Sequence, residues 1–575
     1  MKNLILFFFI LVITSPLLSQ WSTNPAVNNL VSNIPGDQIF VTSCPDGAGG
    51  IIMTWEDNSS GSIKIFAQKI NSFGQAMWTV GGISICPLSF DQRFPDICTD
   101  AAGGAIIYWK DFRAGVPFHF DMYAQRIRTD GMPMWNINGV KVNNLISSET
   151  YMQNKCIPSD AGSSVILWAN GVGADYGLYT QKLDAFGNKL WDVNDILISA
   201  LWKSNFDLCT DGGGGAYFCW SDPDPADLPY WNLYAQHIDA SGIVQWSPKK
   251  TVSAERELQK DPSMCEDQNG GFIVTWLDRR SFYYTPLTPN LDIYAAHFTS
   301  GGINLWQVNG TPICNDLSDQ VDALCISDLH SGAHIFWSDR RNLPVSFYSI
   351  YGQNISYNGT INWTPNGNLI ASREDYYITA GGRYVPQIAS IDALGGIIVC
   401  WLGYYDAALT QYGLLVQKVD YYGSIQWDPN GVFASIGHLK QRPSLIHDGG
   451  SGGCNIAWVD ARSGNYDIYA QHIKSNSLLG NKPKPVSGIV DILSQNYPNP
   501  FNPTTNIAFT LANDANISIS IFDMSGRQLE VLADGFLTAG EHSVTWNASN
   551  YASGTYFYKF TNGNHVEIKK MLLVK

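Results

Sequence analysis

The sequence predicts an all-β chain: an eight-bladed β-propeller closed by an N-terminal strand, followed by a small C-terminal immunoglobulin-like β-sandwich. Three observations lead to this prediction. Glycine is frequent, at 53 of 575 residues, and charged residues make up 15% of the chain, a composition typical of sheets joined by tight turns. One unit of sequence recurs eight times. Its pattern stops after Gly480, where a different pattern begins.

Residues 1–20 have the features of a secretory signal peptide. Lys2 precedes an apolar run from Leu4 to Thr14, and small residues such as Ser19 follow it. We therefore expect residues 1–20 to be absent from the mature protein; a buried N-terminal strand is the alternative. No other run has the length and apolarity of a transmembrane helix, so no such segment is expected in the mature protein.

The repeated unit runs from a turn aspartate through small residues and an apolar run ending in tryptophan to a variable loop, the motif Tyr-x-Gln, a glycine turn and a second tryptophan. The turn aspartates are Asp46, Asp100, Asp160, Asp211, Asp267, Asp328, Asp392 and Asp448. The tryptophans that end the apolar runs are Trp55, Trp109, Trp168, Trp220, Trp276, Trp337, Trp401 and Trp458. Runs such as Ala105 to Trp109 are β-branched and aromatic and too short for helices, so each unit is expected to form four strands.

Four antiparallel strands per unit, with regularly placed aromatic residues, are typical of a β-propeller blade. We assign the propeller to residues 21–478. Neighbouring blades must cover both faces of each blade, and large flat tryptophan and tyrosine side chains fill the wedge between them. We therefore interpret these aromatic residues as packing residues rather than as a ligand cage.

The second tryptophan shows how the ring is expected to close. Seven units contain it, whereas the eighth ends at Asn476 without one. The missing piece resembles the start of the mature chain, where Trp21 and the run from Val27 to Ser32 match Trp135 and its following residues. The N-terminal segment should supply the last strand of the eighth blade and cover an exposed edge.

The 11 cysteines follow the repeat, and most are expected to be small buried apolar groups. Residues in the same register of neighbouring repeats usually lie too far apart for a disulfide. A metal cluster is disfavoured, because no Cys-x-x-Cys motif or Cys/His pair occurs. The acidic run from Asp222 to Asp227 suits Ca²⁺ but lacks the spacing of an EF-hand loop, so no cofactor is predicted. The net charge of −15 makes nucleic acid an unlikely partner.

Acidic and basic residues recur just after the strand tryptophans. They are Asp57, Asp111 with Arg113, Asp222, Asp278 with Arg279 and Arg280, Asp339 with Arg340 and Arg341, and Asp460 with Arg462. General acids or carboxylate clamps are one interpretation. Repetition favours the other, turn hydrogen bonds and ion pairs between blades, because an active site needs residues that differ from their equivalents. No catalytic residue is predicted.

The loops after the strand tryptophans vary in length and are rich in aromatic residues, which indicates a binding rim on one face. The candidate ligand-binding residues are Phe118, Phe120, Tyr230, Trp231, Tyr283, Tyr284, Tyr376 and Tyr377. Such clusters on a rigid scaffold suit sugar faces or protein partners, although they also pack among themselves to order long loops. The sequence thus favours a binding or adhesion module; a propeller glycosidase or polysaccharide lyase and a purely structural surface protein are the alternatives.

The C-terminal region has its own pattern. Residues 479–489 read as a linker, with Lys482-Pro483-Lys484-Pro485 at its centre, and residues 490–575 as a separate domain. The domain opens with the proline-rich run Asn496 to Pro503, and alternating runs such as Ile517 to Ile521 have the period of half-buried strands. A small β-sandwich is expected.

Four landmarks of this domain resemble the type A sorting domain of the type IX secretion system: the proline-rich opener, the run Ile521 to Gly526, the run Ser553 to Tyr558 and the basic end that starts at Lys569. The sorting residues implied by the resemblance are Tyr497, Pro498, Asn499, Pro500, Gly554, Tyr556, Lys569 and Lys570. It also implies that the secretion machinery and its sortase are partners, and that the protein is secreted or held at the outer cell surface. An ordinary immunoglobulin-like module without a sorting role is the alternative.

Overall fold

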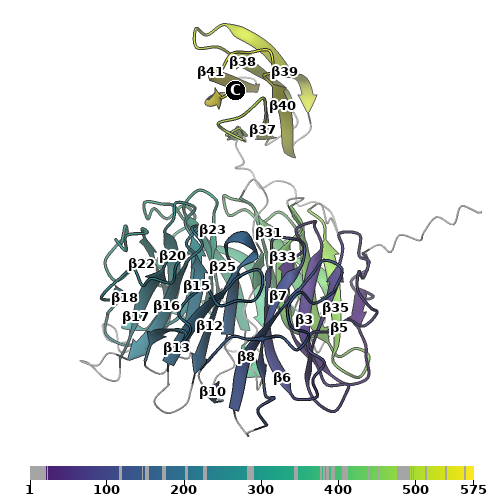
Figure 1. Ribbon diagram of the computed structural model, residues 1–575. Coiled ribbons are helices and arrows are strands. Elements are labelled where there is room, and N and C mark those ends of the chain that lie inside the picture. The colour runs from purple at the N-terminus through teal and green to yellow at the C-terminus, as the bar shows by residue number, and fades with distance from the viewer. Residues whose placement is uncertain are drawn as a thin grey trace, which may run out of the picture. The chain divides into compact units, whose positions relative to one another are not determined.

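The computed structural model places the chain in two compact units, Met1–Gly480 and Asn481–Lys575 (Figure 1). The structure describes residues 21–22, 24–115, 119–144, 147–148, 154–170, 177–200, 205–223, 230–281, 290–341, 347–375, 378–379, 382–383, 387–389, 395–404, 412–437, 440–449, 452–475, 492–493, 495–496, 498–511, 515–537, 540–562 and 565–575. Residues 1–20, the expected signal peptide, lie outside this set. No helix among the described residues is long and apolar enough to cross a membrane.

The strands of the first unit pair antiparallel in sets that follow the sequence repeat. The first four sets are β2 (Gln38–Pro45), β3 (Ile51–Asp57), β4 (Lys64–Ile70) and β5 (Ile83–Ser84); β6 (Gln92–Thr99), β7 (Ala105–Asp111) and β8 (His119–Ile127) with both β9 (Val140–Lys141) and β10 (Ser147–Ser148); β11 (Asn154–Pro158), β12 (Ser164–Asn170), β13 (Gly177–Leu183) and β14 (Ile196–Ser199); and β15 (Phe206–Thr210), β16 (Ala216–Pro223), β17 (Trp231–Ile238) and β18 (Lys250–Ser253). A short 3₁₀ turn, η1 (Asp160–Gly162), joins β11 to β12.

The remaining sets repeat this order. They are β19 (Gln259–Glu266), β20 (Phe272–Asp278), β21 (Asp292–Phe298) and β22 (Thr311–Cys314); β23 (Gln320–Ser327), β24 (Ala333–Asp339), β25 (Phe347–Ile355) and β26 (Asn368–Asp375); β29 (Gln387–Ala389), β30 (Ile397–Tyr404), β31 (Tyr412–Val419) and β32 (Val432–Ile436); and β33 (Lys440–His447), β34 (Cys454–Asp460) and β35 (Asp467–Ile473) with β1 (Asn29–Ser32). The pairing of Glu374 with Gly403 merges the sixth and seventh sets into one eight-stranded sheet. A small hairpin, β27 (Ile378–Thr379) with β28 (Gly382–Arg383), stands apart.

The turn aspartates shape the turn that joins the first two strands of a set. Oδ1 of Asp46 accepts hydrogen bonds from the backbone N–H groups of Ala48, at 2.8 Å, and Gly50, at 2.7 Å. Gly50 is required there, because a Cβ atom would lie 2.4 Å from the carbonyl oxygen of Ile70. The other carboxylate oxygen of Asp46 lies 3.3 Å from Lys69 Nζ, so one side chain holds both the turn and the third strand.

The two series of tryptophans have different roles. The strand tryptophans are at most 1% exposed and lie within the clusters between sheets. The indole N–H groups of the second series cross to the next repeat, where Trp78 donates to the carbonyl of Thr129 at 3.1 Å and Trp135 to that of Ala185 at 3.0 Å. Trp21 completes this series, since its indole donates to the carbonyl of Ser72 at 3.0 Å.

The N-terminal strand pairs with the last repeat, as the sequence predicts. Leu30 of β1 lies opposite Tyr469 of β35. The first strands of successive sets also contact one another, in the order β2, β6, β11, β15, β19, β23, β29 and β33, and β33 contacts β2. The contacts between the first strands of the eight sets therefore form a closed cycle.

The second unit contains two sheets around one core. One sheet has the order β36 (Ile492–Leu493), β37 (Thr504–Leu511) and β40 (Gly540–Asn547), and the other β39 (Gln528–Leu537), β38 (Ala515–Phe522), β41 (Gly554–Asn562) and β42 (His565–Leu573). Trp546 and Tyr558 are fully buried in this core. Every member of the cluster belongs to this unit, which accounts for its compactness.

Candidate functional site

The aromatic rim expected from sequence is only partly described. Phe118, Tyr283, Tyr284, Tyr376 and Tyr377 lie outside the described residues. Tyr230 and Trp231 are half-buried at the start of β17. Phe120 is 2% exposed and packs with Tyr108 and Met122, so the expected exposed ring at this position is corrected to a core ring. The cause is the alternation of β8, which turns Phe120 inward.

The charged residues that follow the strand tryptophans contact the tryptophan and a tyrosine of the same sheet. Trp109 Nε1 donates to Asp111 Oδ2 at 2.8 Å, and Arg113 donates to both carboxylate oxygens at 2.7 Å. The Arg113 guanidinium also lies over the Tyr123 ring, 3.6 Å from its centroid. The same arrangement recurs in Trp276, Asp278, Arg280 and Tyr294, in Trp337, Asp339, Arg341 and Tyr351, and in Trp458, Asp460, Arg462 and Tyr469.

This geometry gives the aspartates a structural role. Asp111 also accepts a hydrogen bond from the Arg113 backbone, which is the expected turn. The expected ion pair between neighbouring repeats is corrected, because the pair of Asp111 and Arg113 lies within one sheet. In the fourth repeat Lys249 replaces the arginine, with Nζ 2.7 Å from Asp222 and 3.5 Å from the centroid of the Tyr234 ring. Asp222, the first residue of the acidic run considered for Ca²⁺, is thus already bound to a cation.

A different series of residues varies from repeat to repeat. It occupies the position six residues before each turn aspartate, which we call the bulge position, and consists of Phe40, Phe94, Asn154, Asn205, Asp261, Asp322, Pro386 and Arg442. Pro386 lies outside the described residues. In five of the others the strand register shifts and φ is positive, between 47° and 58°: Phe40, Phe94, Asp261, Asp322 and Arg442.

Such backbone is uncommon for residues with a Cβ atom, and strained residues and β-bulges gather at functional sites. All five are half-buried. They lie at the end of the first strand that is next to the loops after the strand tryptophans. In the first set, for example, Ile39 beside Phe40 pairs with Glu56, the residue after Trp55. These residues meet the requirement that the repeated aspartates fail, since they share a position but differ in chemistry.

Three of these residues, from three consecutive first strands, contact one another and form what we call the aromatic–arginine cluster. The Arg442 guanidinium lies 3.8 Å from the centroid of the Phe40 ring. The Phe40 and Phe94 rings meet edge to face, with centroids 5.4 Å apart and planes at 86°. Cation–π and edge-to-face contacts of this kind fix flat side chains in defined orientations.

Glu56 binds the backbone of the cluster at Phe94. Its Oε1 accepts the backbone N–H of Phe94 at 2.6 Å, and the side chain is 2% exposed. Burial raises the pKa of Glu56 to about 7, although the Phe94 N–H and the charges of Arg93 and Arg442 act in the opposite direction. A carboxyl group that titrates near neutral pH therefore lies next to the cluster.

We expect Glu56→Gln to abolish part of the pH dependence of stability. The folded-state pKa of Glu56 is raised above its unfolded value of 4.5, so the folded chain binds more protons and loses stability as pH rises from 4.5 to 7. Glutamine keeps the acceptor without the charge. The variant should thus gain up to about 3 kcal/mol relative to the wild type at pH 8 but almost nothing at pH 4.5. Denaturant titrations at both pH values measure this, and an equal difference at both contradicts it.

The bulge positions on β19 and β23 carry carboxylates. Asp261 accepts a hydrogen bond from the Asn205 amide, and Lys260 Nζ lies 3.3 Å from Asp261 Oδ2. Asp322 occupies the equivalent position on β23, which contacts β19. The bulge positions are thus aromatic and basic in one part of the series and acidic in another. No three His, Cys, Asp or Glu side chains gather as metal ligands in the described part of the chain.

In the second unit, the residues expected to carry the sorting signal lie on both sides of one contact. Asn499 Oδ1 accepts a hydrogen bond from the backbone N–H of Leu572 at 2.8 Å. Beside it, the backbone N–H of Phe501 donates to the carbonyl of Leu572 and the N–H of Val574 donates to the carbonyl of Phe501, both at 3.0 Å. Pro498 and Pro500 flank Asn499 and are exposed. The proline-rich opener is therefore fixed against the last strand, although more than 70 residues separate Asn499 from Leu572.

The other expected sorting residues belong to the last two strands. Tyr556 is 8% exposed and donates to the carbonyl of Ala552 at 2.7 Å. Gly554 is the first residue of β41. Lys569 Nζ lies 3.7 Å from Glu567 Oε1, and the side chain of Lys570 is exposed. Tyr497 lies outside the described residues.

Residues 495–575 match the family model described as the secretion system C-terminal sorting domain. These residues are a type IX secretion sorting domain. The sorting domain directs the protein through the type IX secretion system to the cell surface or the extracellular space. It implies an interaction with the secretion machinery.

No curated protein matches the sequence. Among solved structures, the chain is similar to the polysaccharide lyase Uly1, at 12% identity over 70% of this chain and 93% of that chain, with a TM-score of 0.36. It is also similar to an α-L-arabinanase of Penicillium chrysogenum, at 10% identity over 79% and 99%, with a TM-score of 0.34. A protein of unknown function from Dyadobacter fermentans has 9% identity over 78% and 98%, with a TM-score of 0.32.

The bulge positions are not among the site residues expected from sequence, although the sequence contains a signal that identifies them. Once the turn aspartates are aligned, the residue six positions before them is phenylalanine in the first two repeats and asparagine, aspartate, proline or arginine in the others. The positive φ angles and the contacts between neighbouring first strands are properties of the folded chain.

Proposed function

We propose that the mature chain is an exported binding protein. In this proposal residues 1–20 are a signal peptide, residues 21–478 form an eight-bladed β-propeller closed by its N-terminal strand, residues 479–489 are a linker, and the sorting domain at 490–575 is an immunoglobulin-like β-sandwich recognised by the secretion machinery and its sortase. The cyclic contacts of the first strands and the bond from Trp21 to Ser72 support the propeller.

The aromatic–arginine cluster is the observation on which the binding proposal depends. Repeated positions serve the scaffold, whereas Phe40, Phe94 and Arg442 differ from their equivalents, are half-buried, and lie at the end where the variable loops begin. Aromatic ring faces beside charged groups suit a glycan, whose rings stack while its hydroxyl groups form hydrogen bonds. We therefore propose a glycan as ligand, bound at this cluster and by the loops around it.

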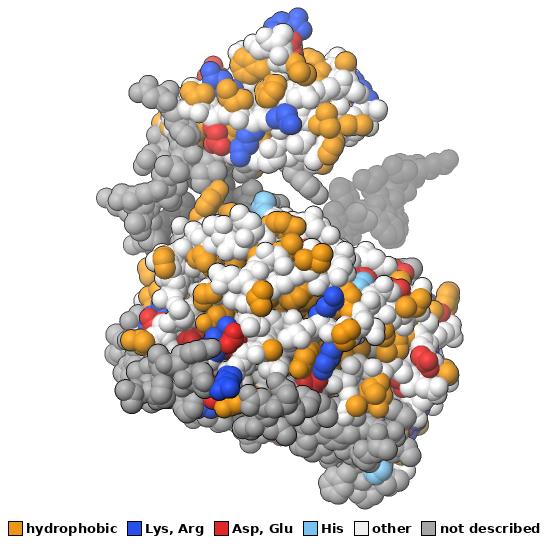
Figure 2. All heavy atoms as spheres, turned by 90° about the vertical axis from the view of Figure 1, so that its left-hand side faces the viewer, with side chains coloured by type: hydrophobic (Ala, Val, Ile, Leu, Met, Phe, Trp, Pro, Cys, Tyr) orange, Lys and Arg blue, Asp and Glu red, His pale blue; other side chains and the backbone are white. Residues whose placement is uncertain are grey.

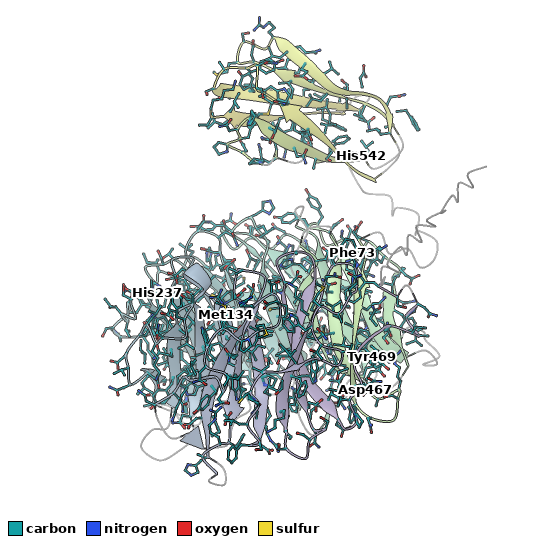
Figure 3. The ribbon with its side chains drawn as sticks, turned by 45° about the vertical axis from the view of Figure 1, so that its right-hand side comes forward. Phe73, Met134, His237, Asp467, Tyr469 and His542 are labelled. Atoms are coloured by element: carbon teal, nitrogen blue, oxygen red, sulfur yellow. The ribbon has the colours of Figure 1, made fainter. Side chains whose placement is uncertain are left out.

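Among the described residues, the exposed apolar side chains visible on one face of the molecule are scattered. On the face shown in Figure 2 they are interspersed with polar and charged residues rather than gathered in one patch. Phe73, one of the most exposed, is 62% accessible and lies in the turn after β4, at the opposite end of its sheet from Asp57. Figure 3 accordingly shows Phe73 above Asp467, which begins β35 at the loop end. Phe73 therefore provides a matched control.

Binding is tested on a glycan array with the wild type and with Phe40→Ala/Phe94→Ala. We expect the double variant to lose at least about tenfold in affinity for the glycans that the wild type retains, because it removes the two rings of the cluster. Phe73→Ala should bind as the wild type does. Equal losses in both variants, or none, contradict the proposal, and capture of a protein in place of any glycan overturns the ligand class.

The two bulge carboxylates favour a second candidate, a glycoside hydrolase or polysaccharide lyase. Asp261 and Asp322 occupy equivalent positions on contacting strands, and glycosidases use pairs of carboxylates. The glycans bound on the array decide between the two candidates: release of reducing ends during incubation with the wild type supports the enzyme, and intact glycans support the binding protein.

A further inference from the structure

Two cysteines of neighbouring sheets lie almost within bonding distance. Cys265 Sγ on β19 and Cys325 Sγ on β23 are 3.1 Å apart, about 1 Å more than the length of a disulfide bond. Both side chains are buried, at 8% exposure, and both are thiols in the structure. The backbones are close as well, because the Cys325 N–H donates to Ser263 Oγ at 3.1 Å.

A shift of register explains why these two side chains face each other. Cys265 pairs with Ile273, three residues before Trp276, whereas Cys325 pairs with Ile335, two residues before Trp337. Successive side chains alternate between the faces of a strand, so this difference of one residue turns the cysteines to opposite faces of their sheets. Cys265 faces the next sheet and Cys325 faces the previous one.

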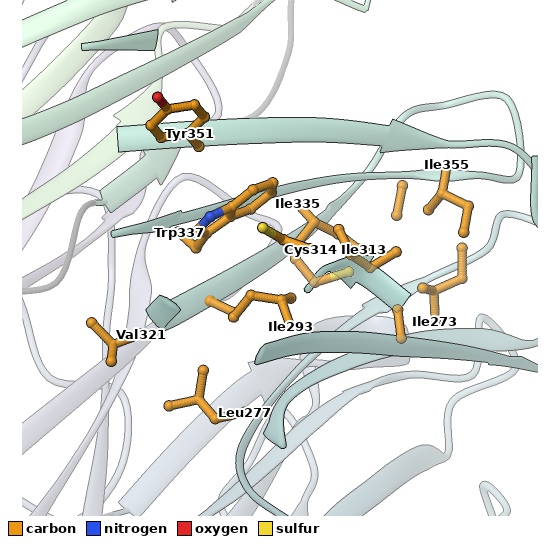
Figure 4. Close-up of a cluster of buried hydrophobic side chains, with 14 of the residues drawn as sticks. Ile273, Leu277, Ile293, Ile313, Cys314, Val321, Ile335, Trp337, Tyr351 and Ile355 are labelled. Atoms are coloured by element: carbon orange, nitrogen blue, oxygen red, sulfur yellow. The ribbon is translucent and has the colours of Figure 1, made fainter. Parts of the chain in front are cut away.

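The surrounding core agrees with this geometry. Ile273 and Ile335, the pairing partners of the two cysteines, belong to the cluster between these sheets that Figure 4 shows. Trp337 lies in this cluster, whereas Trp276 lies in the cluster on the other side of its sheet. The expectation that cysteines of neighbouring repeats lie too far apart concerns equal registers, so it does not apply to this pair.

A second pair has the same register. Cys98 on β6 pairs with Ile106, three residues before Trp109, and Cys156 on β11 pairs with Ile166, two residues before Trp168. The two strands contact each other, and the two cysteines lie in one buried cluster, where Cys98 acts with burial to raise the pKa of the Cys156 thiol. The same one-residue shift has thus brought cysteines together at two separate boundaries between sheets.

We propose that Cys265 and Cys325 form a disulfide between neighbouring sheets in the exported protein, and that Cys98 and Cys156 form another. The oxidant would be a protein disulfide of the exported compartment. The thiolate of one cysteine attacks that disulfide and expels one thiolate, and the second cysteine then attacks the mixed disulfide and expels the other. Two electrons pass to the oxidant, which leaves as a dithiol carrying the two protons of the cysteines.

Burial sets when this exchange takes place. It raises the pKa of the Cys265 thiol well above its ordinary value, and the hydrogen bond from Cys325 acts in the same direction. The attacking species is the thiolate, so exchange is slow once the sheets have packed. Oxidation therefore belongs to the stage at which neighbouring sheets assemble, after the chain has left the reducing cytoplasm.

Peptide mapping of the wild-type protein exported by its own host tests the proposal. The protein is unfolded without reductant in the presence of an alkylating reagent and then digested. We expect the peptide that contains Cys265 to be linked to the one that contains Cys325, and Cys98 to be linked to Cys156, with both links lost after reduction. Recovery of any of these cysteines in alkylated form, or linked to another partner, overturns the bond in question.

Matched serine variants separate a specific bond from incidental oxidation. Cys265→Ser should leave Cys325 free for alkylation and lower the melting temperature by a few degrees. Cys219→Ser, at a buried cysteine of β16 outside the two proposed pairs, should leave both links in place. A Cys325 that finds a new partner in Cys265→Ser indicates unspecific oxidation and contradicts the proposal. The wild-type map decides even where a variant fails to fold.

Discussion

Removing residues 21–33 is expected to lower the melting temperature of the first unit by on the order of 10 °C, far more than removing residues 481–575 does. The N-terminal segment belongs to the last sheet. β1 pairs with β35, and Trp21 and Val31 are 8% and 7% exposed within a cluster that also contains Trp55 and Ile468. Burial of Trp21 alone is worth about 4 kcal/mol or more.

Polar contacts add to this loss. The Asn28 amide donates to the carbonyl of Ala434 at 2.8 Å, and its oxygen accepts a hydrogen bond from Arg462 at 2.9 Å. Deletion leaves these partners unsatisfied and exposes the edge of β35, which then becomes a site for pairing with other chains. By contrast, the core of the second unit consists of its own residues, so its removal takes away little that the first unit needs.

Calorimetry on the full-length mature chain and on the two deletions measures the effect. A pair of point variants in one strand provides the control: Val31→Ala removes a buried side chain and should destabilise, whereas Leu30→Ala removes one that is 47% exposed and should not. If the two deletions lower the melting temperature equally, the N-terminal strand does not close the first unit.

The pairing of the N-terminal strand with the last repeat could be predicted from the sequence. The repeat defines the strand order, because each landmark marks a fixed place in a set: the turn aspartate follows the first strand, and the tryptophan lies near the end of the second. The eighth repeat lacks the second tryptophan, and the matching residue, Trp21, lies at the start of the mature chain. Local spacing is sufficient for such an inference because each unit folds by the same rules.

Side-chain direction was less accessible. Phe120 was expected to be exposed because it belongs to an aromatic loop, but β8 begins at His119, and the alternation of this strand turns the ring inward. Cys265 lies two residues before its turn aspartate, Asp267, and Cys325 lies three residues before Asp328; this shift of one residue reverses the face of the sheet. Both outcomes depend on the parity of a strand, which composition and spacing do not fix where the strand ends are irregular.

Deleting residues 495–575 is expected to keep the protein from the cell surface and the medium altogether, because this segment is the sorting domain on which type IX export depends. The deleted chain should accumulate behind the outer membrane, where fractionation and immunoblotting detect it. The reciprocal fusion is the stronger test. A periplasmic reporter that carries residues 481–575 at its C-terminus should appear outside a host with a functional type IX system.

Two substitutions then separate folding of the sorting domain from its recognition. Asn499→Ala breaks the bond to the backbone of Leu572, and we expect a loss of about 1 kcal/mol in the stability of the domain. Lys570→Glu changes an exposed side chain, so the fusion should stay folded. If the secretion machinery recognises the basic end, export of the fusion should fall. A fusion with both residues intact that remains inside a competent host contradicts the sorting role, since the contact between the opener and the last strand would then serve folding alone.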